Sequence, residues 1–578
     1  MSAETKEKLA GFDHKLGQKV TGAEALILSL LNEDADTLFG YPGGAIMPVY
    51  DAMYQYEGHI KHILTRHEQG AAHAAQGYAR HTGKVGVAMA TSGPGATNLI
   101  TGIADAQIDS TALVCITGQV TSQLLGTDAF QETDIIGISL PVTKWSYQVT
   151  RPEEIPWAIA KAFYIARSGR PGPVLIDITK DAQMSDFEYY YEPCQDVRSY
   201  QPRPELQMDQ VEAAAEAINN AKKPFVLVGQ GVLMGQAQEE FKAFVEKADI
   251  PVGSTLLGLS AFPSNHPLFM GMLGMHGNYA PNLKTNECDV LIAIGMRFDD
   301  RVTGDLARYA KQAKVVHFEL DPAEIHKNVH ADYPILANAK ESLQAILPLI
   351  KETKHKAWIK EFRDLEAIEY EKVIEQDIYP DGQQLKMAEV VHLLAELTEG
   401  KATVVTDVGQ HQMITARYYK YNTTHSNITS GGLGTMGFGL PAAFGAKTGN
   451  PNKQVISISG DGGFQMNLQE LGTIMQENAG VKMIILNNNF LGMVRQWQEL
   501  FFDKRYAETD IASPDFHKLT DAYGIPSRKV VAREDLKEAL QEMLDAKTSY
   551  LLEVVVEKEG NVFPMVPTGA SVSECRLS

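Results

Sequence analysis

Short apolar segments rich in Val, Ile and Leu recur along the chain, each ending at a polar or glycine-rich loop before a helical pattern. This alternation is typical of parallel α/β units, in which a helix connects neighbouring strands. Ligands of open parallel sheets bind where the strands end, so these loops are the first places to search for a site. The segments predicted as strands are 85–91, 112–118, 173–179, 224–229, 290–295, 314–320, 402–407, 453–461, 481–488 and 549–556.

The predicted strands fall into three blocks, so we expect an α/β protein with three doubly wound parallel-sheet domains. Their predicted limits are 19–186, 208–350 and 380–556, followed by a tail over 557–578. Residues 189–207 are rich in Pro and Tyr and predict a linker. The charged helical stretch 351–376 is expected to be a solvated connector. The tail's Pro, Gly and Ser content fits either an ordered lid or a frayed end.

Composition excludes several classes of protein. Of 578 residues 44% are hydrophobic and 21% charged, which is globular rather than disordered. The net charge of −20 and the absence of a basic patch argue against a nucleic-acid partner. Cys115, Cys194, Cys288 and Cys575 are too widely spaced for a zinc site or a disulfide framework, which favours a reducing compartment.

Neither a targeting segment nor a membrane span is evident in the sequence. Residues 1–20 contain no apolar signal region and no Arg- and Ser-rich transit pattern. No apolar run approaches the roughly 18 residues that a spanning helix needs. We therefore expect a cytoplasmic protein that does not enter a membrane.

The most informative stretch is 456–490, in which Asp461 and Asn488 each follow an apolar strand segment. Neighbouring parallel strands would bring both side chains to one sheet edge. Carboxylate and amide oxygens suit Mg²⁺, and Gly462 and Gly463 would let backbone N–H groups approach an anion. The spacing is not that of a Walker A loop. The alternative interpretation without a function is a tight turn followed by a polar loop.

A Gly-Asp-Gly motif followed at this interval by Asn-Asn resembles the diphosphate–metal motif of thiamine-diphosphate enzymes. Other motifs are similar to the catalytic subunit of acetohydroxyacid synthase, also called acetolactate synthase. The similarity covers about residues 19–570 and rests on the combination of motifs. They are YPGG (41–44), RHEQ (66–69), TSGPGATN (91–98), GTDAFQE (126–132), RFDDRVTG (297–304), GQHQM (409–413), SGGLGTMGFGLPAA (430–443) and GMVRQWQ (492–498).

The resemblance implies an enzyme that decarboxylates pyruvate on thiamine diphosphate and joins the two-carbon unit to a second 2-oxoacid. A second pyruvate gives 2-acetolactate, and 2-oxobutanoate gives 2-aceto-2-hydroxybutyrate, both precursors of branched-chain amino acids. The three blocks would bind the cofactor's pyrimidine, FAD and the diphosphate with Mg²⁺, respectively. FAD would be structural, because the main reaction has no net redox change.

Glu68 is the first candidate catalytic residue. The resemblance implies that it hydrogen-bonds the aminopyrimidine ring and controls the tautomer that removes the reactive proton. A buried glutamate tuned toward neutral pH would fit this role, whereas a helix-surface glutamate is the ordinary alternative. Met436 would support the bent cofactor from below, a gap that a soft, unbranched side chain can fill. Ordinary core packing is its alternative.

Further cofactor contacts are also implied by the resemblance. Asp461, Asn488 and the Phe490 carbonyl would hold Mg²⁺. The other implied thiamine-diphosphate positions are Gly43, Pro94, Asn98, Val408, Gly409, Gln410, His411, Gly434, Gly462 and Gly463. The implied flavin positions are Arg170, Gly229, Gly231, Thr255, Leu256, Met275, His276, Gly295, Arg297, Asp299 and Glu319.

The resemblance also implies residues that contact substrate. Trp497 would favour the larger acceptor, because a rigid apolar wall discriminates one methylene by about 1–3 kcal/mol. Arg301 would meet the acceptor carboxylate with its guanidinium fork. An ordinary core Trp and a surface salt bridge are the respective alternatives. The other implied positions are Met493, Phe130, Gln131 and Lys180, of which Gln131 and Lys180 are also catalytic candidates.

Some positions depart from the family pattern without touching Glu68, Asp461 or Asn488. Thr121 stands where many relatives have Pro, and Asn338 stands where a flavin-contacting Asp is common. The closest rival function is another FAD-containing thiamine-diphosphate 2-oxoacid decarboxylase or oxidase. Glu68 argues against a glyoxylate carboligase. A non-catalytic paralogue is the rival from another class.

The resemblance finally implies partners. The cofactor of this family lies between two subunits, so a homodimer is the minimum active unit and a tetramer is compatible with it. A small regulatory subunit is expected because bacterial relatives often bind one.

Overall fold

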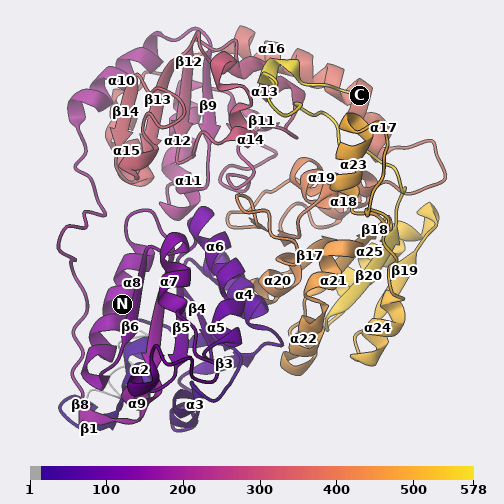
Figure 1. The fold of residues 1–578 in the computed structure, drawn as a ribbon. Helices are drawn as coiled ribbons and strands as arrows, with labels where there is room; N and C mark the ends of the chain where they lie inside the picture. Colours follow the sequence, from indigo (N-terminus) through magenta and orange to yellow (C-terminus); the bar gives the residue numbers. More distant parts are fainter. Residues whose placement is uncertain (1–14) are drawn as a thin grey trace.

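Three six-stranded sheets, all of them parallel, form the centre of the protein (Figure 1). The structure is a computed structural model that describes residues 15–578, so the expectation drawn from residues 1–14 lies outside the described residues. The α/β class with three parallel sheets is confirmed. Across the described residues, no helix combines the length and the apolar composition needed to cross a membrane.

The first sheet has the strand order β3-β2-β4-β5-β7-β6. Its central strands are buried on both faces, as expected for parallel strands covered by helices. The strands are β2 (Thr37–Gly40), β3 (Lys61–Leu64), β4 (Gly86–Ala90), β5 (Leu113–Gln119), β6 (Trp145–Val149) and β7 (Pro173–Thr179), and β1 (Lys19–Thr21) pairs antiparallel with β8 (Asp186–Glu188). The helices are α2 (Gly22–Asn32), α3 (Met47–Tyr54), α4 (Glu68–Thr82), α5 (Pro94–Asn98), α6 (Ile100–Ile108), α7 (Ile135–Ser139), α8 (Ile155–Arg167) and α9 (Lys180–Met184).

The second sheet has the order β11-β10-β9-β12-β13-β14 and lies above the first in Figure 1. Its strands are β9 (Pro224–Val228), β10 (Val252–Ser254), β11 (Phe269–Met272), β12 (Val290–Ile294), β13 (Lys314–Glu319) and β14 (Tyr333–Leu336). The helices are α10 (Met208–Asn220), α11 (Gly231–Met234), α12 (Gln238–Ala248), α13 (Tyr279–Thr285), α14 (Asp300–Thr303), α15 (Ala339–Ile346), α16 (Lys356–Glu369) and α17 (Glu375–Ile378).

The third sheet has the order β16-β15-β17-β18-β20-β19. Its strands are β15 (Thr403–Thr406), β16 (Asn427–Thr429), β17 (Val455–Gly460), β18 (Lys482–Asn487), β19 (Ser527–Val530) and β20 (Tyr550–Val555). The helices are α18 (Met387–Leu397), α19 (Gln410–Tyr418), α20 (Gly439–Gly449), α21 (Asp461–Met466), α22 (Leu471–Glu477), α23 (Gly492–Phe501), α24 (Phe516–Ala522) and α25 (Arg533–Asp545).

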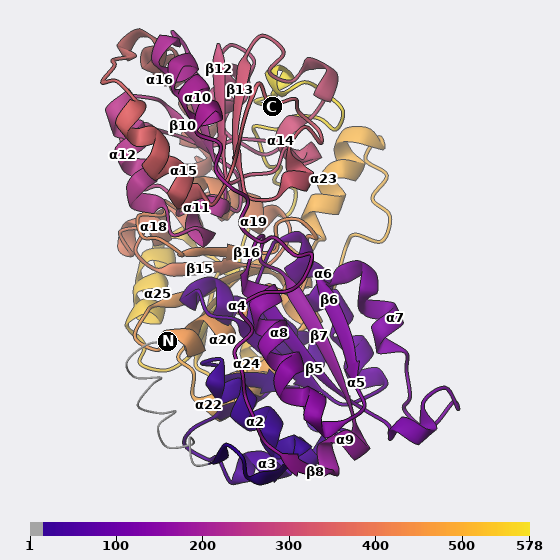
Figure 2. The same ribbon diagram turned by 90° about the vertical axis from the view of Figure 1, so that its left-hand side faces the viewer.

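The first and third sheets share one hydrophobic core through the helix pair α4 and α20 (Figures 1 and 2). The pair packs closely because glycines face backbone on the other helix. A Cβ on Gly77 would collide with the Ala442 carbonyl, and one on Gly445 with the Ala74 carbonyl. Together with alanines, these glycines explain the small-residue composition of α4.

The connector after the second sheet is not simply a solvated helix, so that expectation was wrong. Trp358 and Phe362 of α16 are buried, and the Phe362 ring lies 5.1 Å from that of Phe225 on β9. The helix is amphipathic, with most of its charges on the outer face, whereas Glu369 at its end is buried and forms an ion pair with Arg417.

The tail after β20 is packed rather than frayed. Val562, Val566 and Val572 are buried, and Asp305 donates its backbone N–H to the Ala570 carbonyl at 3.0 Å. The carboxyl terminus therefore ends beside the second sheet's helices α13 and α16 (Figure 1).

Candidate active site

A cavity of about 1380 Å³ lies where residues of the three sheets meet. Its walls come from the loops after α6 and α8, from the strand ends of the second sheet, and from α23 and the loops of the third sheet. The candidate site residues that line it are Arg170, Gly231, Thr255, Leu256, Met275, His276, Gly295, Arg297, Asp299, Arg301, Glu319, Val408, Gly409, Gly434, Met436, Met493 and Trp497.

Glycines let two strand ends of the second sheet approach each other at the cavity wall. Gly231 donates its N–H to the Gly295 carbonyl at 2.8 Å, and a Cβ on Gly231 would lie 2.6 Å from Gly295 Cα. Gly295 also has φ of +61°, which favours glycine. Gly229 does not line the cavity, but it donates its N–H to the Ile294 carbonyl directly behind this contact.

Polar groups of the second sheet face the same space. Burial lowers the pKa of His276 to about 3, so its imidazole is neutral, and its Nδ1 has no hydrogen-bond partner. Burial raises the pKa of Glu319 to about 6, although its carboxylate accepts N–H groups from Leu320 and Asp321. A large cavity with glycine-lined walls and an unpartnered buried imidazole fits a bulky heteroaromatic ligand.

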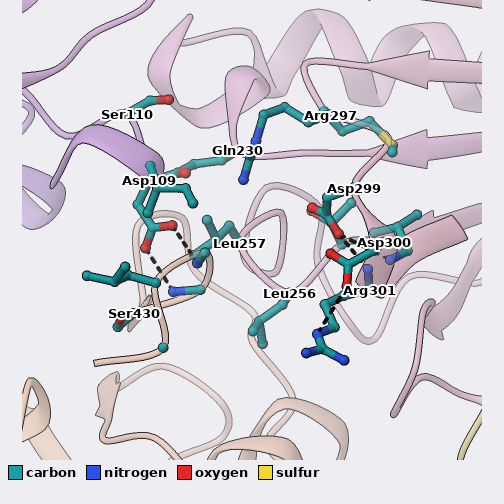
Figure 3. A pocket seen from close by; sticks show the side chains of 18 of the residues that line it. Asp109, Ser110, Gln230, Leu256, Leu257, Arg297, Asp299, Asp300, Arg301 and Ser430 are labelled. Carbon is teal, nitrogen blue, oxygen red and sulfur yellow. Dashed lines mark hydrogen bonds and ion pairs between the residues drawn. The ribbon is translucent and has the colours of Figure 1, made fainter. Parts of the chain in front are cut away.

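Asp299 fixes the start of α14 and with it the position of Arg301. Its carboxylate accepts the backbone N–H groups of Arg301 and Val302 at 3.0 and 3.2 Å (Figure 3). The Arg301 guanidinium lies 3.4 Å from the Met275 sulfur and remains 57% exposed. The Arg301 guanidinium is therefore accessible to an anion and does not form a buried salt bridge.

Asp407 was missed from the sequence and organises the third-sheet part of the cavity. This buried carboxylate follows β15 and accepts the N–H groups of Val408, Gly437 and Gly439 at 2.8–3.1 Å. It thereby joins the loop that contains Val408 and Gly409 to the loop that contains Gly434 and Met436. An aspartate at the end of an apolar strand, immediately before Val-Gly, is the signal that could have identified it.

Gln410 and His411 form the first turn of α19 and lie behind the cavity rather than in its wall. Gln410 donates its side-chain amide to Gln496 Oε1 at 2.9 Å and to the Gly560 carbonyl of the tail at 2.8 Å. Burial lowers the pKa of His411 to about 4, and its Nε2 has no partner.

Asp461 and Asn488 lie at the same sheet edge, as their spacing predicts, because β17 and β18 are parallel neighbours. Asp461 Oδ2 accepts the Ser513 hydroxyl at 2.8 Å, whereas its buried Oδ1 has no partner. Asn488 Oδ1 accepts the Phe490 N–H at 3.1 Å. An orphaned carboxylate oxygen beside amide and carbonyl oxygens fits Mg²⁺.

No group of three His, Cys, Asp or Glu side chains among residues 15–578 could hold a metal by itself. A cation at Asp461 would thus depend on amide, carbonyl and ligand oxygens. Gly462 and Gly463 follow Asp461 in α21, and a Cβ on Gly463 would collide with the Asp407 carboxylate. The Met436 methyl group lies 3.9 Å from where a Gly462 Cβ would be, so this edge adjoins the cavity.

Trp497 and Met493 extend from α23 into the cavity wall. The Trp497 ring packs edge-on against Phe501, with 5.7 Å between centroids. The indole is half-buried, so it is not an ordinary core tryptophan.

Apart from Arg170, the candidate residues of the first sheet form a separate group that does not line the cavity. Glu68 begins α4 and accepts the Asn98 side-chain amide at 3.0 Å. It is half-buried within one chain, so the expectation of a buried glutamate is not met there. This group comprises Glu68, Gly43, Pro94, Asn98, Phe130, Gln131 and Lys180.

The loop that contains Phe130 and Gln131 is exposed but closely packed at its base. The Phe130 side chain is 88% exposed, and Gln131 has φ of +59°. A Cβ on Gly93 would lie 2.8 Å from the Gln131 carbonyl, which requires glycine there. Lys180 begins α9, and Gly43 packs against the Thr91 side chain.

Comparison with known families agrees with this division into three sheets. Residues 20–138, 211–346 and 407–554 match, respectively, the N-terminal TPP binding domain, the central domain and the C-terminal TPP binding domain of "Thiamine pyrophosphate enzyme". Each match contains most strands of one sheet.

Individual proteins are similar over nearly the whole chain. A "Probable acetolactate synthase large subunit" of Methanocaldococcus jannaschii is 46% identical over 561 residues, covering 96% of this chain and 94% of its own. The "Acetolactate synthase isozyme 2 large subunit" of Escherichia coli is 45% identical over 558 residues, covering 96% and 99%. The "Acetolactate synthase large subunit" of Haemophilus influenzae is 44% identical over 571 residues, covering 97% and 99%.

Identity at this level across both chains is far above what a shared fold alone requires, and all three domain types are present in order. The chain belongs to the acetolactate synthase large subunits, a family of thiamine pyrophosphate enzymes.

Proposed function

We propose that the chain is the catalytic subunit of an acetolactate synthase. It decarboxylates pyruvate and transfers the two-carbon unit to a second pyruvate or to 2-oxobutanoate, in the first common step of valine, leucine and isoleucine synthesis. The observation that carries this proposal is the edge of the third sheet. There, Asp461 with its orphaned oxygen, Asn488 and the Met436 loop adjoin one cavity in a chain with full-length relatives of that name.

The cofactors follow from the donors present. Asp461, Asn488 and the Phe490 carbonyl would hold Mg²⁺, and the backbone around Gly409, Gly462 and Gly463 would hold the diphosphate. When bound, thiamine diphosphate supplies the carbanion chemistry that releases CO₂. The part of the cavity lined by the second sheet would hold FAD, in a structural role.

The chain's own residues position the reactants. Glu68 holds a proton shared with the pyrimidine ring, and Asn98 orients its carboxylate. Met436 supports the cofactor, while Arg301 binds the carboxylate of the acceptor. Trp497 and Met493 form the apolar wall against the acceptor's alkyl group. Gln131, Phe130 and Lys180 approach from the first sheet.

The separation of Glu68 from the cavity within one chain supports a site shared between two chains. We therefore infer a homodimer as the minimum active unit, with a tetramer as the larger assembly. The words "large subunit" in the relatives' names support a small regulatory partner. Four free cysteines support a reducing, cytoplasmic location.

The test is product analysis on purified protein with Mg²⁺, thiamine diphosphate, FAD, and equal pyruvate and 2-oxobutanoate. We expect mostly 2-aceto-2-hydroxybutyrate in wild type and a strong loss of both products in Glu68→Gln. Acetaldehyde or acetyl phosphate as the main product would instead indicate a decarboxylase or an oxidase. Equal behaviour of wild type and Glu68→Gln would reject the assignment.

A further inference from the structure

Two buried carboxylates of the first sheet's helices face the loop that precedes Met436. Asp105 lies in α6, and Asp109 follows the helix by one residue. Both are fully buried, and neither belongs to the candidate site residues discussed above. Both contact residues 430–435, which we call the glycine loop and which belong to the third sheet's part of the cavity wall.

Asp109 uses both of its oxygens on this loop. Oδ2 accepts the Gly431 N–H at 2.8 Å, and Oδ1 accepts the Gly432 N–H at 2.7 Å (Figure 3). Arg80 of α4 donates Nη2 to Oδ2 at 2.9 Å and Nη1 to the Thr429 carbonyl at 2.5 Å. These bonds are charge-assisted, hence stronger than those between neutral groups.

The two glycines are required by the closeness of this contact. A Cβ on Gly432 would lie 2.8 Å from Ile108 Cγ1 and 2.9 Å from Asp109 Oδ1. A Cβ on Gly431 would lie 2.7 Å from Leu257 Cγ of the second sheet's part of the cavity. The loop is thus held between α6 and Leu257, with no room for a side chain at Gly431 or Gly432.

Asp105 closes the same loop at its ends. Its Oδ1 accepts the hydroxyls of Ser430 and, at 3.1 Å, Thr435. The Ser430 hydroxyl in turn accepts the Thr435 N–H at 2.8 Å. The residue that follows Thr435 is Met436, so the anchored segment leads directly to the side chain proposed to support the cofactor.

We propose that Asp109, with Arg80 behind it, is a positioning residue that sets the place of Gly434 and Met436 through the backbone of the glycine loop. The loop crosses from the third sheet to a helix of the first, so the contact transmits the position of α6 to the cavity wall. This inference rests on the proposed function, because it assigns Met436 a role in binding thiamine diphosphate.

The test uses Asp109→Asn and a matched control, Asp289→Asn. Asp289 likewise accepts two consecutive backbone N–H groups, those of Lys222 and Lys223 at 2.7 and 2.9 Å, but it does not line the cavity. In Asp109→Asn one accepting oxygen becomes an NH₂ group, which then faces another donor, either Arg80 or a backbone N–H. The substitution therefore weakens the anchor while keeping the side-chain volume.

We expect Asp109→Asn to raise the Kd for thiamine diphosphate, followed by tryptophan fluorescence, by about 10-fold or more. Peptides covering 430–437 should exchange their amide hydrogens faster in the cofactor-free protein. The KM for pyruvate should change little while kcat falls. The control Asp289→Asn should change neither the exchange of 430–437 nor cofactor affinity, even where it lowers the melting temperature.

Gly432→Ala provides a second test that leaves the buried Arg80–Asp109 pair in place. The added Cβ displaces the loop from α6, so Gly432→Ala should reproduce the faster amide exchange and the weaker binding of thiamine diphosphate. This variant tests the proposal if Asp109→Asn fails to fold. Unchanged exchange and unchanged cofactor affinity in either folded variant would overturn the proposal. Neither readout needs turnover, so a wild type that binds thiamine diphosphate but makes no acetolactate would reject only the proposed function.

Discussion

The Asn98 side-chain amide donates a 3.0 Å hydrogen bond to the Glu68 carboxylate, which joins the end of α5 to the start of α4. The two residues are 30 positions apart in the sequence but adjacent at the edge of the first sheet. The bond restricts the rotamer of Glu68, so the carboxylate points in one direction rather than sampling several. A group that exchanges a proton with a cofactor benefits from such fixed orientation.

Glu68→Gln should lower kcat by about 100-fold to 10,000-fold, because glutamine keeps the shape but cannot exchange the proton. Asn98→Ala should lower kcat less, since it frees the carboxylate without removing it. Steady-state acetolactate formation measures both. Glu57→Gln, at an exposed position in the turn between α3 and β3, is the control and should retain wild-type kcat. A Glu68→Gln enzyme within threefold of wild type would contradict the assigned role.

Trp497→Leu should reduce the preference for 2-oxobutanoate over pyruvate by about 10-fold or more, because a rigid wall for one methylene is removed. The product ratio at equal substrate concentrations measures this preference directly. Phe501→Leu is the matched control, since Phe501 packs on Trp497 from the same helix but does not line the cavity. Equal product ratios in wild type and Trp497→Leu, whatever the kcat, would place acceptor selection elsewhere.

Buried His73 should make the free energy of unfolding depend on pH. It is fully buried on α4, and burial lowers its pKa from 6.5 to about 3, with Arg80 adding to the shift. Unfolded chains bind the proton near pH 6.5 and the folded chain does not, so this contribution to stability is complete above pH 6.5 and is lost as pH falls toward 3.

Between pH 6.5 and about 5, wild type should therefore lose about 1–2 kcal/mol more stability than His73→Gln. Glutamine removes the titrating group while leaving a polar partner for Gln76, which lies 3.2 Å from His73 Nδ1. Urea-unfolding midpoints at the two pH values measure the difference. The other buried histidines are present in both proteins, so their contributions cancel in the difference between wild type and His73→Gln. Parallel pH profiles would show that His73 does not titrate between the two states.

Most central strands of the three sheets could be predicted from sequence, and the edge strands could not. Each predicted segment became an interior strand, because strands covered on both faces are continuous apolar runs. The edge strands β3, β6, β11, β14, β16 and β19 were missed, as were the short strands β2 and β10. Half-exposed or three- to four-residue strands lack a periodic signal.

Some residues of the candidate site could likewise be predicted from the sequence, and others could not. Asp461 and Asn488 could be placed together because one crossover helix separates two paired strands. The Asp407 and Asp109 anchors bind backbone N–H groups of distant loops. The local sequence marks Asp407 as an aspartate at the end of a strand, but it does not encode which distant N–H groups either carboxylate binds. The charge of residues 351–376 led to the prediction of a solvated helix, although Trp358 and Phe362 in the same sequence indicate an apolar face.

Two inactive chains should restore activity when mixed, because the proposed site takes Glu68 from one chain and Asp461 from the other. Glu68→Gln and Asp461→Asn should each be nearly inactive alone. After dissociation and reassociation at equal amounts, about one quarter of wild-type activity should return, since half of the dimers are mixed and each has one intact site. Differently tagged chains confirm by pull-down that mixed dimers form, and two tagged preparations of Glu68→Gln are the control that should stay inactive. Mixed dimers without activity would place Glu68 and Asp461 in the same chain's site and overturn the shared arrangement.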